Sequence, residues 1–191
     1  MTGSTGGTGD TRSRIQAVAL ELFTEQGYEK TSLREIAERL DVTKAALYYH
    51  FKSKDDIVNS LVSDRIDRLD ELVKWATDQP ADGTGRRAAI GRYADEFFGE
   101  HGYTVMRFFE QNQTMLKSLA SGQVMRDRLL RMADALARPD TSPASQLRAA
   151  LALFAIHSSW FAIRNPEVGD EQRRELALEV AYELLDRIGE N

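Results

Sequence analysis

The chain has 191 residues, of which 42% are hydrophobic and 29% are charged, with a formal net charge of −5 and no cysteine. This length and apolar content suit one or two small domains with a hydrophobic core, and they exclude global disorder. The absence of cysteine excludes disulfides and thiolate zinc sites, and a reducing, cytoplasmic location is the expectation that follows.

Residues 1–10 contain four glycines and no apolar run, so we expect a flexible tail there rather than a signal peptide. The longest stretch without a charged residue runs from Ala149 to Ile163 and has 15 residues. That is fewer than the ~20 residues that a helix needs to cross a bilayer. We therefore expect no membrane span.

From residue 11 onward the spacing of apolar residues is helical, and we expect no strand. The first helix is predicted over residues 12–26, and Gly27 ends it. Its buried stripe is formed by Ile15, Val18, Ala19, Leu22 and Phe23.

Two short helices follow the first one. The second begins after Ser32, and Glu35 three residues later completes a capping box. The third runs from Lys44 to His50, with Thr43 as its N-cap. Two short helices joined by a tight turn predict a helix-turn-helix.

A long fourth helix is predicted from the N-cap Ser53 to about Thr77, followed by a loop over residues 79–85. Further helices are predicted over residues 86–100, 103–118, 123–137, 142–164 and 170–188. The expected fold is therefore all-α, with about nine helices.

The third predicted helix separates apolar from polar residues. At ~100° per residue, Lys44, Ala45, Tyr48 and Tyr49 share one face, and Leu47 and Phe51 lie on the other. The segment from Lys30 to Lys54 carries six basic and three acidic residues, a net charge of +3 in a chain of net charge −5. Such a basic module favours docking on DNA. The alternative is a generic helical hairpin with solvated charges.

The run TSLREIAERLDVTKAALYYHFKSKDDIV, from Thr31 to Val58, resembles the DNA-binding signature of the tetracycline-repressor (TetR) family of bacterial transcriptional regulators. The resemblance implies an all-helical homodimer of cytoplasmic subunits. Each subunit would have a flexible tail (residues 1–10), a three-helix DNA-binding head (residues 11–56) and a C-terminal body for ligand binding and dimerisation (residues 57–191).

The resemblance also implies which residues contact DNA. It places Thr31, Ser32 and Thr43 at phosphates, Lys44, Ala45 and Tyr49 at base edges or the adjoining backbone, and Tyr48, His50 and Lys54 at further phosphates. The chain departs from the family pattern at three positions. Leu40 replaces a small residue, Ala45 replaces a frequent glycine, and Asp41 replaces the turn glycine. Aspartate suits that turn because it enters the left-handed region more readily than most residues.

The predicted helix over residues 142–164 is apolar on nearly all sides, which is typical of a helix buried on more than one side. We expect it to pair with the final helix in a four-helix dimer interface; ordinary monomer core is the alternative. The expected interface residues are Leu147, Leu151, Phe154 and Phe161, together with Leu178, Ala181, Leu185 and Ile188.

Aromatic and methionine side chains are concentrated in the body, where the resemblance implies a small-molecule site. The candidate ligand-binding residues are Phe97, Tyr103, Met106, Phe109, Met132, His157 and Trp160. For each of them core packing is the alternative, and for His157 that means a hydrogen-bonded core histidine. We expect an apolar or aromatic effector.

The chain has three histidines and neither a His-Glu-x-x-His motif nor a nucleophile elbow, so we expect no metal site, no cofactor and no catalysis. The prediction is a DNA-binding regulator, in particular a repressor released from a palindromic operator by a small effector. Two alternatives remain: a helical-bundle enzyme or carrier for an apolar small molecule, and a ligand-independent DNA-binding dimer.

Overall fold

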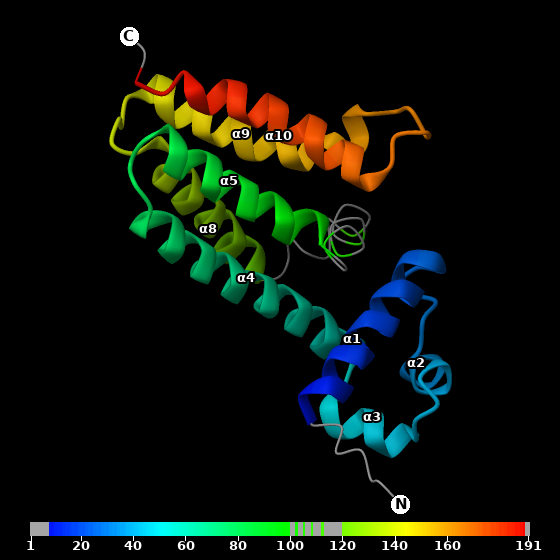
Figure 1. Cartoon of the computed structure of the whole chain (residues 1–191). Coiled ribbons are helices and arrows are strands. Elements are labelled where there is room, and N and C mark those ends of the chain that lie inside the picture. The colour runs from blue at the N-terminus through cyan, green and yellow to red at the C-terminus, as the bar shows by residue number, and fades with distance from the viewer. Residues whose placement is uncertain are drawn as a thin grey trace, which may run out of the picture. The chain divides into compact units, whose positions relative to one another are not determined.

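The computed structural model describes residues 8–99, 102, 105, 108, 112 and 120–189. Within these residues the chain is all-helical, as predicted, and has eight helices (Figure 1). They are α1 (Thr8–Glu25), α2 (Leu33–Arg39), α3 (Lys44–His50), α4 (Lys54–Asp78), α5 (Gly83–Phe98), α8 (Ala120–Ala137), α9 (Pro143–Ala162) and α10 (Asp170–Asp186). Most of the helix expected over residues 103–118 lies outside the described residues.

The contacts divide the chain into two compact units. The head unit comprises residues 1–65 and 103–121, and the body unit comprises residues 66–102 and 122–191. The head unit therefore includes the first turns of α4 and the buried Phe108, and it extends beyond the expected range of residues 11–56. None of the described helices is long and apolar enough to cross a membrane.

In the head unit, α1 begins at Thr8, so residues 8–10 are helical and the expectation of a tail over all of residues 1–10 is wrong there. Most of its predicted stripe is buried, and Phe23 has no exposed surface. The helix ends at Glu25 because Gly27 adopts a φ of +94°, a conformation that glycine enters without steric cost.

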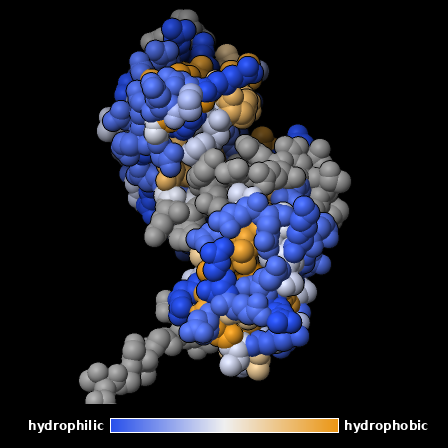
Figure 2. Space-filling view, turned by 90° about the vertical axis from the view of Figure 1, so that its right-hand side faces the viewer, coloured by the Kyte–Doolittle hydropathy of each residue, from blue (hydrophilic) through white to orange (hydrophobic). Residues whose placement is uncertain are grey.

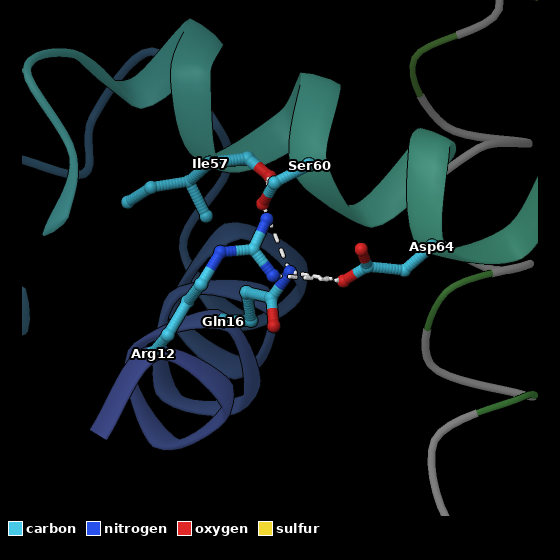
Figure 3. A network of polar contacts seen from close by, with 5 residues as sticks. All are labelled: Arg12, Gln16, Ile57, Ser60 and Asp64. Atoms are coloured by element: carbon cyan, nitrogen blue, oxygen red, sulfur yellow. Dashed lines mark hydrogen bonds and ion pairs between the residues drawn. The ribbon is translucent and has the colours of Figure 1, made fainter. Parts of the chain in front are cut away.

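A polar network that periodicity did not predict joins α1 to the first half of α4 (Figure 3). The Gln16 side-chain amide donates to the Ser60 hydroxyl at 2.9 Å and to the Asp64 carboxylate at 2.6 Å. Arg12 reaches the same carboxylate at 3.3 Å. Because Gln16 and Ser60 are buried, these hydrogen bonds satisfy polar groups that water cannot reach and so fix the packing of the two helices.

An aromatic cluster closes the other end of the head. The Phe23 ring lies 5.0 Å from Tyr28 and 5.6 Å from Phe108, measured between ring centroids. The Tyr28 hydroxyl donates to Asp55 in the first turn of α4. Burial, together with that hydrogen bond, raises the pKa of Tyr28 above its ordinary value, so the hydroxyl keeps the proton that it donates to Asp55 even in alkaline solution.

The body unit contains α5, α8, α9 and α10, and α10 packs against both α9 and α5. Its core includes Ala89, Ile90, Phe97, Met132, Leu136, Ala149, Ala152, Ile156, Ala181 and Leu185. α5 begins at Gly83, earlier than predicted, because the Asp82 side chain caps the Gly85 amide at 3.0 Å. A Cβ at Gly85 would lie 1.9 Å from the Pro80 carbonyl oxygen, so only glycine fits this turn.

Candidate nucleic-acid interface

The first helix of the helix-turn-helix, α2, begins with the predicted capping box. The Ser32 hydroxyl accepts from the Glu35 amide at 3.2 Å, and the Glu35 carboxylate accepts from the Ser32 amide at 2.7 Å. Hydrogen bonds from the Ser32 hydroxyl and amide hold the pKa of Glu35 below its ordinary value. The prediction of Ser32 as N-cap is confirmed, and its exposed side chain lies at the helix N-terminus.

The second helix of the motif, α3, has the predicted bounds and the predicted N-cap, because Thr43 accepts from the Ala46 amide at 3.1 Å. Leu47 is fully buried. The opposite face presents Lys44 and Ala45 to solvent, together with Tyr49, which is 74% exposed. The exposed face of α3 thus carries a positive charge and an aromatic ring.

The turn between α2 and α3 is made by Asp41, which adopts a φ of +54°. The Val42 amide donates to the Ala37 carbonyl at 3.0 Å and the Asp41 amide to the Glu38 carbonyl at 3.2 Å. These two bonds form a Schellman motif, which requires a left-handed residue at this position. The expectation that aspartate takes the place of the turn glycine is confirmed.

Replacing Asp41 by glycine is expected to stabilise the head by about 0.5–1 kcal/mol, because glycine adopts a positive φ without strain. The measurement is the free energy of unfolding of the variant and of the parent in urea. Asp41→Ala is the matched control, since it removes the same carboxylate but keeps a Cβ. If Asp41→Ala were as stable as Asp41→Gly, backbone strain at this turn would have no part in the effect.

Two predicted phosphate contacts need correction. The Thr31 side chain is 2% exposed, and its hydroxyl donates to the Gly27 carbonyl at 2.9 Å, so it braces the end of α1 instead of facing solvent. The Lys54 ammonium donates to the Tyr28 carbonyl at 2.6 Å and lies 4.4 Å from the centre of the Tyr28 ring. Lys54 is therefore half-buried and held against Tyr28, so its ammonium is not free to reach a phosphate as was expected.

Two other predicted contacts, Tyr48 and His50, are half-buried. The Lys44 ammonium lies 5.5 Å from the centre of the Tyr48 ring, and the His50 ring lies 5.2 Å from that of Tyr49. Lys52 was not among the predicted residues. Its ammonium donates to the Tyr48 carbonyl at 2.6 Å and so adds positive charge beside the C-terminal end of α3.

Some of the local positive charge is neutralised within the head. Arg34 pairs with Glu38 at 2.7 Å and Arg39 with Glu25 at 3.4 Å, both at exposed positions. Lys44 makes no ion pair with any residue that the structure describes, and its charge remains at the start of α3. Part of the positive charge predicted from the sequence thus lies on α3, the helix that carries the exposed Tyr49.

The predicted ligand-binding residues do not form one described cavity. Tyr103, Met106 and Phe109 lie outside the described residues. Phe97 and Met132 are fully buried in the body core. The Trp160 ring lies 5.9 Å from that of Phe98, and the His157 ring 4.9 Å from that of Phe97. His157 shares a hydrogen bond with the Tyr93 hydroxyl, which confirms its interpretation as a hydrogen-bonded histidine.

The residues predicted for a dimer surface are exposed on α9 and buried on α10. On α9 four large apolar residues remain exposed, namely Leu147 (59%), Leu151 (42%), Phe154 (56%) and Phe161 (57%). The residues expected from the final helix, Leu178, Ala181, Leu185 and Ile188, are buried within the subunit. On α10 it is Leu176 and Val180 that remain exposed. Figure 2 shows one side of the molecule, where patches of hydrophobic residues interrupt a mostly hydrophilic surface.

Residues 15–61 match the family model described as bacterial regulatory proteins of the tetR family. AcrR, an HTH-type transcriptional regulator of Shigella flexneri, is 48% identical over 52 residues, 27% of this chain and 24% of AcrR. The transcriptional activator FasR of Mycolicibacterium smegmatis is 31% identical over 114 residues, 59% of this chain and 51% of FasR. IcaR of Staphylococcus aureus, a negative regulator of a biofilm operon, is 42% identical over 62 residues, 32% of this chain and 33% of IcaR.

These alignments thus cover about a quarter to a half of each curated relative. Solved structures match over more of the chain. PfmR of Thermus thermophilus, a TetR family regulator, has a TM-score of 0.70 at 25% identity and covers 93% of this chain and 100% of its own. AmtR of Mycobacterium smegmatis has a TM-score of 0.71 at 23% identity, with coverages of 97% and 90%. AcrR, FasR, IcaR and PfmR are named as transcriptional regulators.

Proposed function

We propose that this chain is a transcriptional regulator of the TetR family that binds double-stranded DNA through α3, because residues 15–61 match the family model of tetR-type bacterial regulatory proteins. The observation that carries the proposal is the exposed face of α3, where Lys44, Ala45 and Tyr49 lie beside one another while Leu47 anchors the helix to the core. A helix of this kind docks in the major groove, and its first residues contact base edges.

The remaining polar groups of the motif suit the DNA backbone. Ser32 and Thr43 lie at the N-termini of α2 and α3, where free amides and the helix dipole favour phosphates. Lys44 and Lys52 add positive charge at the two ends of α3. Because these contacts release counterions, DNA affinity falls steeply as the salt concentration rises.

The test uses DNA fragments selected from a random-sequence pool by the wild-type protein. Lys44→Ala and Tyr49→Ala are each expected to weaken binding by ~1–3 kcal/mol, as measured by fluorescence anisotropy, because each removes a contact to DNA. Both side chains are exposed, so the free energy of unfolding should not change. Lys74→Ala, at an exposed lysine on α4, is the matched control and should bind like the wild type. Wild-type affinity in both α3 variants would contradict the proposal.

We propose further that the protein binds DNA as a homodimer. The exposed apolar residues of α9 and α10 support this, because a second copy can bury them across a two-fold axis. Two heads related by such an axis reach successive major grooves ~34 Å apart, so the operator would be a near-palindrome.

Repression is the proposed sign of regulation, since a dimer seated on an operator excludes other proteins from it. IcaR is named as a negative regulator and FasR as an activator, and a promoter–reporter fusion separates the two outcomes. We propose that a small apolar or aromatic effector releases the repressor. The effector must bind one arrangement of the heads more tightly than the other, and by linkage operator DNA must weaken effector binding by the same factor.

A further inference from the structure

An open groove of about 180 Å³ lies between α8 and α9 in the body unit. Its lining residues are Arg126, Leu129, Leu130 and Ala133 from α8, and Ala150, Leu153, Phe154 and His157 from α9. On each helix these residues fall at i, i+3 or i+4 and i+7, so each helix contributes one continuous face. Four of the residues that the sequence suggested for ligand binding are described by the structure, and of these four His157 lines this groove whereas Phe97, Met132 and Trp160 do not.

The groove has an apolar floor and one polar end. Arg126 is the first lining residue of α8, and His157 is the last of α9. The two helices are joined by the short connection 138–142 and run in opposite directions (Figure 1). Arg126 and His157 therefore belong to the same end, and aliphatic and aromatic side chains form the rest.

The arginines of α8 differ in their ion pairs. Arg128 and Arg131, on the same helix, pair with Asp70 and Asp127. Arg126 makes no ion pair with the residues that the structure describes, and it lines the groove. A guanidinium recognises a carboxylate through two parallel hydrogen bonds, an arrangement that a neutral hydroxyl cannot match.

We propose that this groove is a binding site for small carboxylates with an apolar body, such as aryl-substituted acetates. The carboxylate pairs with Arg126, and the apolar body lies on Leu129 and Leu153. The volume of the groove, about 180 Å³, suits one aromatic ring, because an apolar cavity of about 150 Å³ holds a benzene molecule. The inference concerns ligand binding alone and does not depend on the proposed DNA binding, so each can fail without the other.

The test measures binding of two probes to the full chain without DNA, by isothermal titration calorimetry. Phenylacetate and phenylethanol share a ring and differ in charge. The wild type should prefer phenylacetate by about tenfold or more, the range of a hydrogen bond to a charged group. Arg126→Gln should leave the affinity for phenylethanol unchanged. It should lower the affinity for phenylacetate until the two affinities lie within about twofold of each other. Arg131→Gln is the matched control and should keep the preference.

A third variant, Ala150→Trp, fills the groove and should abolish binding of both probes. Sedimentation of each variant shows whether its oligomeric state has changed. This measurement separates a blocked groove from a disrupted dimer. Failure of the wild type to bind either probe, or a carboxylate preference that survives in Arg126→Gln, would overturn the proposal. Loss of the dimer in Ala150→Trp, with no probe binding to the wild type, would show that a side chain of a second copy occupies the groove.

Discussion

Replacing Phe23 by alanine is expected to lower the free energy of unfolding of the head by about 3–5 kcal/mol, the range for truncating a fully buried aromatic side chain. Phe23 has no exposed surface and packs against the rings of Tyr28 and Phe108. Removal of the Phe23 ring leaves a cavity beside Tyr28. Hydrogen bonds from Tyr28 to Asp55 and from Lys54 to the Tyr28 carbonyl hold this residue in place, so the cavity cannot close easily. Urea denaturation followed by circular dichroism measures the change.

Tyr49→Ala is the matched control, because it also truncates an aromatic side chain of the head but at a position that is 74% exposed. The two variants should lose different properties. Phe23→Ala should lose stability, and DNA binding with it at temperatures where the head unfolds, whereas Tyr49→Ala should lose DNA affinity at unchanged stability. A stable Phe23→Ala variant would show that this cluster does not hold the head together.

The second large effect is expected at the apolar stripe of α9. Substituting glutamate at both Leu147 and Leu151 should convert the proposed dimer into a monomer of 21.5 kDa at micromolar concentration. The dimer would carry two copies of each side chain, and burying a leucine contributes ~1.5–3 kcal/mol. The dissociation constant of the dimer should therefore rise by a factor of at least about 10⁴. Sedimentation velocity measures the mass directly.

Val124→Glu is the control for added charge, because Val124 is an exposed apolar residue that lies on α8 and not on α9. This variant should remain a dimer of twice 21.5 kDa. A double variant that stayed dimeric, or a wild-type protein that was monomeric at the same concentration, would place the dimer interface elsewhere or remove it.

The sequence predicted the helix-turn-helix in detail because local interactions determine it. The side chains of Ser32, Thr43 and Ser53 cap helices within three residues of themselves, and a pattern of residue types is enough to recognise them. Asp41 likewise adopts its left-handed conformation through bonds to neighbours in the turn. Local spacing also separated buried Leu47 from exposed Tyr49.

Long-range contacts account for what the sequence could not predict. The hydroxyl of Thr31 turns inward because the Leu22 and Gly27 carbonyls meet it at the end of α1, and nothing in the motif itself distinguishes it from exposed Ser32. The Gln16–Asp64 hydrogen bond joins residues 48 positions apart. On α10, periodicity predicted which residues form an apolar stripe but not which helix that stripe packs against. The stripe that contains Ala181 is buried within the subunit, whereas Val180 is exposed.

The central claim, that α3 lies in the major groove of DNA, is tested most directly by methylation interference on the selected DNA fragments. Methylation of guanine N7 blocks the major groove, whereas methylation of adenine N3 blocks the minor groove. The account predicts that N7 methylation prevents binding at two symmetry-related clusters about one helical turn apart, and that Tyr49→Ala weakens the interference there. Interference by methylation of adenine N3 alone, or an interference pattern that substitutions in α3 leave unchanged, would contradict the placement of α3 in the major groove.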